Sequence, residues 1–340
     1  MRKSQMHITL FKSGKTPIPP LGYGGTERHI YWVAQKLVEL GHKVTLVANP
    51  WSHIPGVDLR PVPAESDAQT WLRQIPADTD IVHFHERPAA EINKPYLVTT
   101  HGNGQPGEQF PLNTVFVSRR HAANHGSVHF VHPGLIPEDY TFSPEREPFA
   151  IFLAKSRWAV KNFKGAVRVA RLAGLELRVV GSRNLPLNLQ RWLPAIRGVR
   201  YYGTADEATK RDLLSKARCL IFPVRWEEPF GLSVTEALVS GCYVLATPYG
   251  SLPEIITPEV GVLSAKASEL AKNAREPGGF DPHACRQRVL AGGFTLLDCV
   301  NRYLQCYERI LTHGLLGEPG EAAPITHPGF VAKHLLPWED

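Results

Sequence analysis

Short hydrophobic runs alternate with amphipathic stretches along most of the chain. In the first part, apolar runs at 7–11 and 43–48 flank a helical pattern at about 26–40. Short apolar runs between turn residues predict buried strands, whereas apolar positions with helical spacing predict amphipathic helices. We expect further strands at 81–85, 96–100, 114–118 and 128–131. This alternation predicts a parallel sheet covered by helices, as in α/β folds.

A proline-rich stretch interrupts the alternation, and the pattern then begins again. Pro133, Pro137, Pro144 and Pro148 predict a connection between two domains. After it, strands are expected at 149–154, 176–180, 199–202, 219–224 and 243–246, and helices near 165–172 and 232–240.

We therefore expect two α/β domains, at 1–146 and 147–293, then a helix at 294–312 and a tail rich in glycine and proline at 313–340. The chain has 340 residues, of which 43% are hydrophobic and 21% charged, which suits a soluble protein of two domains. A ligand between two such domains would touch the carboxyl ends of both sheets, where open α/β sheets bind their ligands.

The charge balance is mildly basic. Lysine and arginine number 38 against 32 acidic residues, a net charge of +6. This bias is compatible with phosphorylated ligands or an anionic surface, and equally with general solubility. The basic residues are scattered and lack interleaved aromatic residues, so we expect no nucleic-acid partner.

Cysteine usage and hydropathy indicate a cytoplasmic location. The five cysteines show no Cys-x-x-Cys spacing, which favours reduced thiols over a zinc or redox site. The N-terminal residues turn polar too early for a signal peptide, and no apolar run approaches the ~18 residues of a membrane span.

Two glutamates flank a turn between a predicted strand and a predicted helix. Glu228 follows the strand at 219–224, and Glu236 lies in the second turn of the helix at 232–240. Because helical side chains lean toward the N-terminus, we expect both carboxylates to reach the same site. Paired sugar hydroxyls are the natural hydrogen-bond donors to such carboxylates. The alternative is that both glutamates are solvated surface residues.

The turn between these glutamates is suited to an anion. The backbone amides of Phe230, Gly231 and Leu232 would point outward at a helix N-terminus, and Gly231 allows a close approach of the chain. Turn and carboxylates together predict a site for a sugar nucleotide.

These residues resemble the retaining glycosyltransferases of family 4, whose signature is a Glu, seven intervening residues and a second Glu. Glu228 and Glu236 match it, and the similarity extends over 24–27, 100–102, 131–134 and 250–255. The resemblance implies the GT-B architecture: two facing Rossmann-like domains around an interdomain active-site cleft. It also implies that the second domain mainly holds the donor, that the first mainly holds the acceptor, and that the last helix returns to the first domain.

The resemblance assigns further residues to the donor. Gly24 and Gly25 lie in a glycine-rich stretch after the first strand, which on its own is equally compatible with an ordinary loop. The resemblance makes Gly25 a contact of the donor diphosphate and places the His101 imidazole beside the donor hexose. Gly181, which ends the strand at 176–180, is included in the donor site.

A basic loop follows the first strand of the second domain. Lys155, Arg157, Lys161 and Lys164 repel one another unless solvent or a negative ligand such as a diphosphate offsets their charge. Relatives carry Gly-Arg where this chain has Ala154-Lys155. We select Lys155 and Lys161 as the cationic pair, with Arg157 and Lys164 as substitutes; the alternative is a solvated basic loop.

We expect no metal site. His83 and His85 alternate on one strand and point the same way, but no third ligand with suitable spacing is evident, and we favour a structural role for His83. Asp78 and Asp80 precede a strand instead of ending one, which favours a capped turn over a metal-binding pair.

The resulting functional expectation is a retaining transfer of a hexose-type sugar from a nucleotide-diphosphate sugar, UDP-sugar favoured, to an acceptor hydroxyl. Glu228 would hold hydroxyls of the transferred sugar, Glu236 those of the ribose, and the cations and amides the leaving diphosphate. No cofactor is required beyond this donor substrate. The acceptor would be a sugar, a lipid-linked glycan or a small molecule; a membrane surface would suit the second of these, but no amphipathic helix calls for one.

Two alternatives remain open. One is a sugar phosphorylase or nucleotide-sugar epimerase of the same architecture, and the other is a non-catalytic nucleotide-sugar binding protein.

Overall fold

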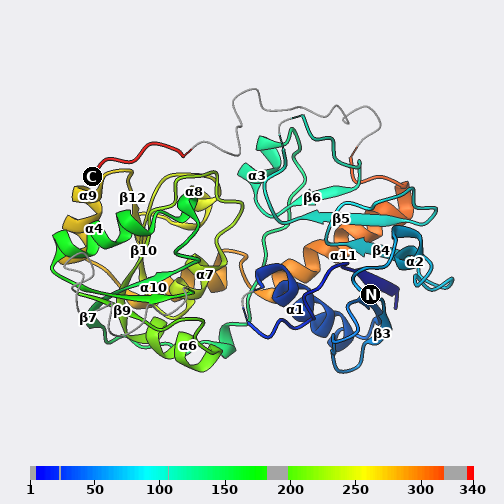
Figure 1. Ribbon diagram of the computed structural model, residues 1–340, viewed down its shortest axis with the longest axis horizontal. Coiled ribbons are helices and arrows are strands. Elements are labelled where there is room, and N and C mark those ends of the chain that lie inside the picture. The colour runs from blue at the N-terminus through cyan, green and yellow to red at the C-terminus, as the bar shows by residue number, and fades with distance from the viewer. Residues whose placement is uncertain (1–4, 23, 106, 182–197, 318–334) are drawn as a thin grey trace. The chain divides into compact units, whose positions relative to one another are not determined.

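The computed structural model describes residues 5–22, 24–105, 107–181, 198–317 and 335–340. These divide into two compact units (Figure 1). Residues 5–134 and 295–317 belong to the first unit, and residues 135–294 and 335–340 belong to the second.

The sheet of the first unit contains six parallel strands in the order β3-β2-β1-β4-β5-β6. The strands are β1 (His7–Phe11), β2 (Lys43–Ala48), β3 (Asp58–Pro61), β4 (Ile81–Phe84), β5 (Tyr96–Thr100) and β6 (Thr114–Phe116). The helices of this unit are α1 (Gly25–Glu39), α2 (Ala68–Leu72), α3 (Arg119–Asn124) and α11 (Leu296–His313). The expected parallel α/β arrangement is therefore present.

The strand expected at 128–131 does not form. Only an isolated bridge pairs Phe130 with Phe116, through hydrogen bonds from Phe116 N–H to His129 O (3.0 Å) and from Val131 N–H to Phe116 O (2.8 Å). Three of the four residues are apolar, but no neighbouring strand among the described residues covers the start of the run, and Val128 is 74% exposed.

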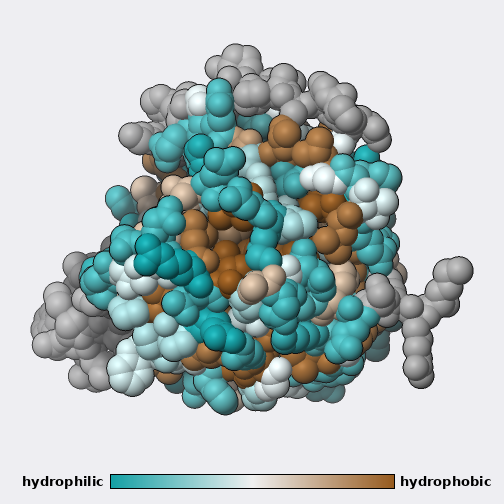
Figure 2. All heavy atoms as spheres, turned by 90° about the vertical axis from the view of Figure 1, so that its right-hand side faces the viewer, coloured by the Kyte–Doolittle hydropathy of each residue, from teal (hydrophilic) through white to brown (hydrophobic). Residues whose placement is uncertain are grey.

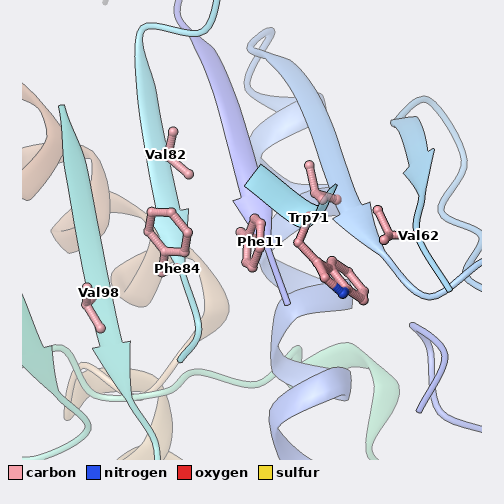
Figure 3. Close-up of a cluster of buried hydrophobic side chains, with 7 residues drawn as sticks. Phe11, Val62, Trp71, Val82, Phe84 and Val98 are labelled. Atoms are coloured by element: carbon pink, nitrogen blue, oxygen red, sulfur yellow. The ribbon is translucent and has the colours of Figure 1, made fainter. Parts of the chain in front are cut away.

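One hydrophobic cluster fills the space between the first sheet and α2. Figure 3 shows Trp71 of α2 turned toward side chains that project from the neighbouring strands. The cluster consists of Phe11, Val47, Val62, Trp71, Val82, Phe84 and Val98. These strand residues share a face because side chains in a strand alternate, and their burial fixes the register of the central strands.

The second unit repeats the same topology. Its six parallel strands are ordered β12-β11-β10-β7-β8-β9. They are β7 (Glu147–Leu153), β8 (Glu176–Val180), β9 (Val199–Tyr201), β10 (Ala217–Phe222), β11 (Tyr243–Ala246) and β12 (Gly261–Leu263). Its helices include α4 (Phe163–Ala173), α6 (Glu207–Lys216), α7 (Leu232–Val239), α8 (Leu252–Ile255), α9 (Ala267–Arg275) and α10 (Pro282–Ala291). Both sheets thus have the doubly wound strand order of Rossmann-like domains.

The boundary between the two units falls after Gly134, earlier in the chain than the boundary after residue 146 that the sequence predicts. Residues 135–146, which the sequence places with the first domain, lie with the second unit. Their side chains explain this placement: Tyr140 OH donates to Glu236 (2.9 Å), and Arg146 Nη1 donates to Ser215 O (2.8 Å).

The long helix α11 packs in the first unit against α1 and β5. Thr295 and Asp298 form a capping box at its start. Tyr303 OH lies 3.2 Å from both His29 Nε2 and Thr99 Oγ1, and Tyr307 OH lies 2.7 Å from His83 Nδ1. A buried polar network therefore connects α11 to α1 and to the sheet.

All five cysteines are free thiols, and burial raises the pKa of Cys242 to about 12 and of Cys306 to about 11.

On the face drawn in Figure 2, hydrophobic residues gather in patches bordered by polar ones, as is common on protein surfaces. Among the described residues, no helix has the length and apolar character needed to cross a membrane.

We expect the free energy of unfolding to decrease as the pH falls below about 6.5. Burial lowers the pKa of His29 from 6.5 to about 4, so between these values the unfolded chain binds a proton that the folded chain does not. This group alone should cost about 3 kcal/mol by the lower end of the window. Burial also lowers the pKa of His83, which adds to the effect.

Urea titrations at about pH 7 and about pH 5 would measure this loss. His29→Gln should reduce the difference between the two pH values, whereas His53→Gln, at an exposed position, should leave it unchanged. Equal stability of the original chain at both pH values would contradict the expectation.

Candidate active site

The strand order of the second sheet creates a switch point between β7 and β10. From these neighbouring strands the sheet continues to β8 on one side and to β11 on the other. Open α/β sheets bind their ligands at the carboxyl ends of the strands beside such a switch point. The basic loop follows β7 and the turn with Glu228 follows β10, so the sheet brings both to this edge.

Glu228 is buried and bound to a lysine. The residue is 7% exposed, and its Oε2 accepts hydrogen bonds from Lys161 Nζ (2.6 Å) and from the indole Nε1 of Trp226 (2.6 Å). Lys161 also lies over the rings of Trp226 and Phe222, 4.8 and 5.1 Å from their centroids. Burying an unpaired carboxylate is strongly unfavourable, and the ammonium group of Lys161 offsets this free-energy cost.

Glu236 repeats this arrangement with different partners. It lies on α7, is 8% exposed, and its Oε1 accepts hydrogen bonds from Lys210 Nζ (2.6 Å) and Tyr140 OH (2.9 Å). Lys210 of α6 also pairs with Glu207, at 2.9 Å. Burial and the charge of Glu236 raise the pKa of Tyr140 well above its ordinary value, so its hydroxyl remains a donor.

Each carboxylate is therefore fixed through one oxygen by a lysine and an aromatic side chain. Within the described part of the chain, the hydrogen bonds to Glu228 fall on Oε2 and those to Glu236 on Oε1. The other oxygen of each can accept hydrogen bonds from a ligand without losing these contacts. Neither glutamate is a solvated surface residue.

Sequence reasoning did not find three of these partners. Trp226 lies in the stretch that indicated the site, but nothing marked its indole as a donor to Glu228. Lys210 lies in a helix that was not predicted, and Tyr140 lies in the proline-rich connection. A signal for Lys210 could have come from the Asp206 cap of α6 and the spacing of Lys210 from Glu207, which together indicate a helix.

The turn after Glu228 is held by the loop after β11. Ser251 N–H donates to Glu228 O (2.9 Å), and Ser251 Oγ donates to Phe230 O (2.6 Å). Gly250 packs so closely that a Cβ there would lie 2.2 Å from Glu228 N. Gly231 has a φ of 91°, a conformation that favours glycine, and α7 begins at the next residue, Leu232.

The cations of the basic loop are separated by the structure. Lys161 is buried against Glu228, whereas Lys155 is partly buried with its ammonium 4.6 Å from the ring centroid of Trp158. Arg157 and Lys164 are exposed. Gly181 follows β8 and packs against Ala154: its φ is 95°, and a Cβ there would lie 2.9 Å from Ala154 O.

In the first unit, His101 follows β5 and belongs to a cluster of imidazoles. Its Nε2 lies 3.0 Å from His85 Nδ1, and its ring centroid lies 5.5 Å from that of His29. Burial, with neighbouring imidazoles, lowers the pKa of His85 and His101 well below the ordinary value, so both rings are neutral near pH 7. The equivalent switch point of this sheet, between β1 and β4, carries the ion pair Lys12–Glu86 (2.8 Å).

The remaining candidates of the first unit have structural contacts. Gly24 is the N-cap of α1, and Gly25 is its first residue. His83 has both ring nitrogens engaged, with Tyr307 and with Thr99 (2.7 Å each).

Asp78 and Asp80, which precede β4, accept hydrogen bonds from residues of the neighbouring strands β1 and β2. Asp80 accepts from His7 N–H (2.7 Å), and Asp78 accepts from Lys43 Nζ (2.6 Å). Among the described residues, no group of three or more His, Cys, Asp or Glu side chains is arranged to hold a metal ion.

Comparison with known proteins is consistent with this geometry. Residues 153–276 match a protein-family model described as glycosyl transferases group 1, a segment that includes Lys155, Lys161, Glu228 and Glu236. No curated protein sequence matches the chain.

Solved structures of similar fold cover nearly all of the chain. AviGT4, a glycosyltransferase involved in avilamycin A biosynthesis, is 23% identical, with a TM-score of 0.75 over 91% of this chain and 98% of that chain. Sucrose-phosphate synthase from Thermosynechococcus elongatus is 18% identical, with a TM-score of 0.71 over 91% and 100%. HepE from Anabaena, solved with UDP-glucose, is 14% identical, with a TM-score of 0.65 over 91% and 100%. The chain has the two-domain α/β fold of these GT-B proteins, and the family match supports a glycosyltransferase.

Proposed function

We propose that this protein transfers a hexose-type sugar from a nucleotide-diphosphate sugar to an acceptor hydroxyl, with retention of the anomeric configuration. The observation that carries the proposal is the pair of buried glutamates, Glu228 and Glu236, each fixed by a lysine beside a tight turn. The family match over 153–276 supports it, and the UDP-glucose complex of HepE favours a UDP-sugar as donor.

The two carboxylates have separate roles in this proposal. Glu236 lies on α7 and binds the ribose hydroxyls of the nucleotide, whereas Glu228 lies before the turn and binds hydroxyls of the transferred sugar. Both oxygens of a carboxylate accept hydrogen bonds, so the oxygen not used by the lysine is available to a sugar hydroxyl. The lysines orient both carboxylates before the donor arrives.

The leaving diphosphate would be stabilised by cations and backbone amides. Phe230, Gly231 and Leu232 supply the amides at the N-terminus of α7. The charge of Lys161 is offset by Glu228 in this structure, so Lys155 and Arg157, on the same loop, are proposed to add positive charge. Such groups accelerate transfer because they stabilise the negative charge that develops on the departing diphosphate.

The remaining candidates are proposed to act around the reacting sugar. Gly181 keeps the edge beside Ala154 open to the donor, and Gly24 and Gly25 offer backbone to the diphosphate. His101 is neutral near pH 7, because burial lowers its pKa, and a neutral imidazole does not repel the positive charge that develops at the anomeric carbon. No metal or other cofactor takes part in this scheme.

Retention would follow from attack of the acceptor on the same face that the diphosphate leaves, assisted by the leaving phosphate. Retaining glycosidases instead use a carboxylate nucleophile and a covalent intermediate. Glu228 is a poor candidate for such a nucleophile, since Lys161 and Trp226 already neutralise and bind it.

A donor screen tests the proposed function. UDP-, GDP-, ADP- and TDP-glucose should be compared by thermal shift, and the true nucleotide should raise the unfolding temperature in proportion to the logarithm of its saturation. Transfer is then measured with labelled donor and a panel of hydroxyl acceptors. Phosphate-dependent release of sugar phosphate, or epimerised donor, would identify the related enzyme classes; a chain that no sugar nucleotide stabilises would refute the proposal.

Glu236→Gln and Lys155→Ala should separate donor binding from turnover. Glu236→Gln should raise the donor KM about tenfold, because the ribose loses a charge-assisted hydrogen bond. Lys155→Ala should lower kcat about a hundredfold, because the leaving diphosphate loses a cation. Lys161→Ala should also lower kcat, because Glu228 loses the lysine that fixes its carboxylate. Steady-state kinetics with varied donor measure both, and Lys272→Ala on the exposed face of α9 is the control. Unchanged KM and kcat in all three variants would reject these roles.

Gly250→Ala should weaken donor binding and lower stability. The added Cβ would lie 2.2 Å from the backbone nitrogen of Glu228 at a φ of 65°, so the turn must move; a strain of this kind costs about 2 kcal/mol. Gly278→Ala is the matched control in the same unit, because nothing lies within 4 Å of its Cβ position. Thermal unfolding and UDP titration would measure the two effects, and equal behaviour of the two variants would contradict the packing argument.

A further inference from the structure

The segment 335–340 lies on the second unit although the chain before it, up to residue 317, belongs to the first. In Figure 1 it is drawn in red beside α9 and β12. Glu339 N–H donates to Ala265 O and Ala267 N–H donates to Glu339 O, both at 2.8 Å, which forms a parallel bridge between Glu339 and Lys266. Lys266 Nζ also lies 3.1 Å from the Glu339 carboxylate.

The other end of this segment is bound to the loop that carries the candidate site. Leu336 N–H donates to Arg225 O at 2.9 Å, and Arg225 Nε donates back to Leu336 O at 2.7 Å. Arg225 precedes Glu228 by three residues. Its own N–H donates to Val160 O (2.7 Å), the residue before Lys161. Arg225 therefore connects the segment to both members of the Lys161–Glu228 pair.

A further contact reaches the loop that packs on the turn. Tyr249 OH donates to Pro337 O at 2.7 Å. The next residue, Gly250, is the one whose backbone packs against Glu228. The segment thus binds both loops that determine where Glu228 lies, and it reaches Glu228 and Lys161 only through them.

These contacts bear on binding because loops must be ordered before they can hold a ligand. An intramolecular hydrogen bond contributes about 1 kcal/mol net, and ordering the backbone of one residue costs about 1–2 kcal/mol. A loop that is already fixed avoids that cost when the ligand binds, so the ligand binds more tightly.

We propose that residues 335–340 form a positioning segment that fixes the loops 223–231 and 249–252 for the donor. This inference relies on the proposed function for the identity of the ligand, but the ordering of the loops can be measured without any ligand. The segment acts through Arg225 and Tyr249, so it is a positioning element and not part of the catalytic groups.

The test compares the original chain with two variants of the segment. Leu336→Pro removes the N–H that donates to Arg225 O, and deletion of 335–340 removes every contact. Trp338→Phe is the control, because the indole Nε1 of Trp338 donates to Asp340, within the segment itself. Hydrogen exchange of 223–231 and 249–252, together with titration by UDP, supplies the two readouts.

Both altered chains should exchange amides of these two loops about tenfold faster and bind UDP about tenfold more weakly, whereas Trp338→Phe should match the original chain. Exchange in β1 and β4 of the first unit should not change. Loops that exchange as in the original chain would overturn the proposal, as would a uniform loss of protection throughout the second unit, which would indicate a role in general stability alone.

The exchange measurement also separates this inference from the proposed function. If the original chain binds no nucleotide diphosphate, the proposed function fails, and the exchange of the two loops alone decides whether the segment positions them. If UDP binds the original chain and the deleted chain equally, the segment has no role in donor affinity and the inference fails while the proposed function stands.

Discussion

The contact between Lys161 and Glu228 is the interaction on which the rest of the candidate site depends. A carboxylate at the carboxyl edge of a sheet can be buried only if its charge is compensated, and Lys161 Nζ does this at 2.6 Å. Lys210 does the same for Glu236. The lysine and an aromatic donor use one oxygen of each glutamate, so they orient the carboxylate and leave its other oxygen as an acceptor. Removing either lysine would leave a buried charge without a partner.

The scaffold explains why these groups meet. The strand order places the loops after β7 and β10 side by side, and these loops carry Lys161 and Glu228. Contacts from Gly250 and Ser251 then fix the turn between Glu228 and α7. The segment 335–340 is hydrogen-bonded to the same loops through Arg225 and Tyr249. The site is therefore built by a rigid sheet edge with several layers of loop contacts, a design that suits a binding site needing little rearrangement.

Most of the fold could be predicted because buried strands leave a clear hydrophobic signal. The strands β1, β2, β5, β8 and β11 have the expected bounds. The strand β3 was missed because Asp58–Pro61 is mostly exposed, and β12 (Gly261–Leu263) was also missed. The strand expected at 128–131 was wrong, since an apolar run predicts a strand only where a neighbour can bury it. The histidines facing α11 likewise form one network only because helix and sheet pack together.

Sequence alone determined the class of fold, the two α/β units and the glutamates, glycines and lysines that mark the candidate site. These are local signals: hydrophobic spacing, turn residues and a spaced acidic pair depend on neighbours in the chain. Only the tertiary structure decided that Lys161, and not another cation of its loop, binds Glu228, and that Tyr140 and Lys210 hold Glu236. These contacts join residues 67, 96 and 26 positions apart. Pairings at such separations arise from strand order and helix packing, which no local pattern encodes.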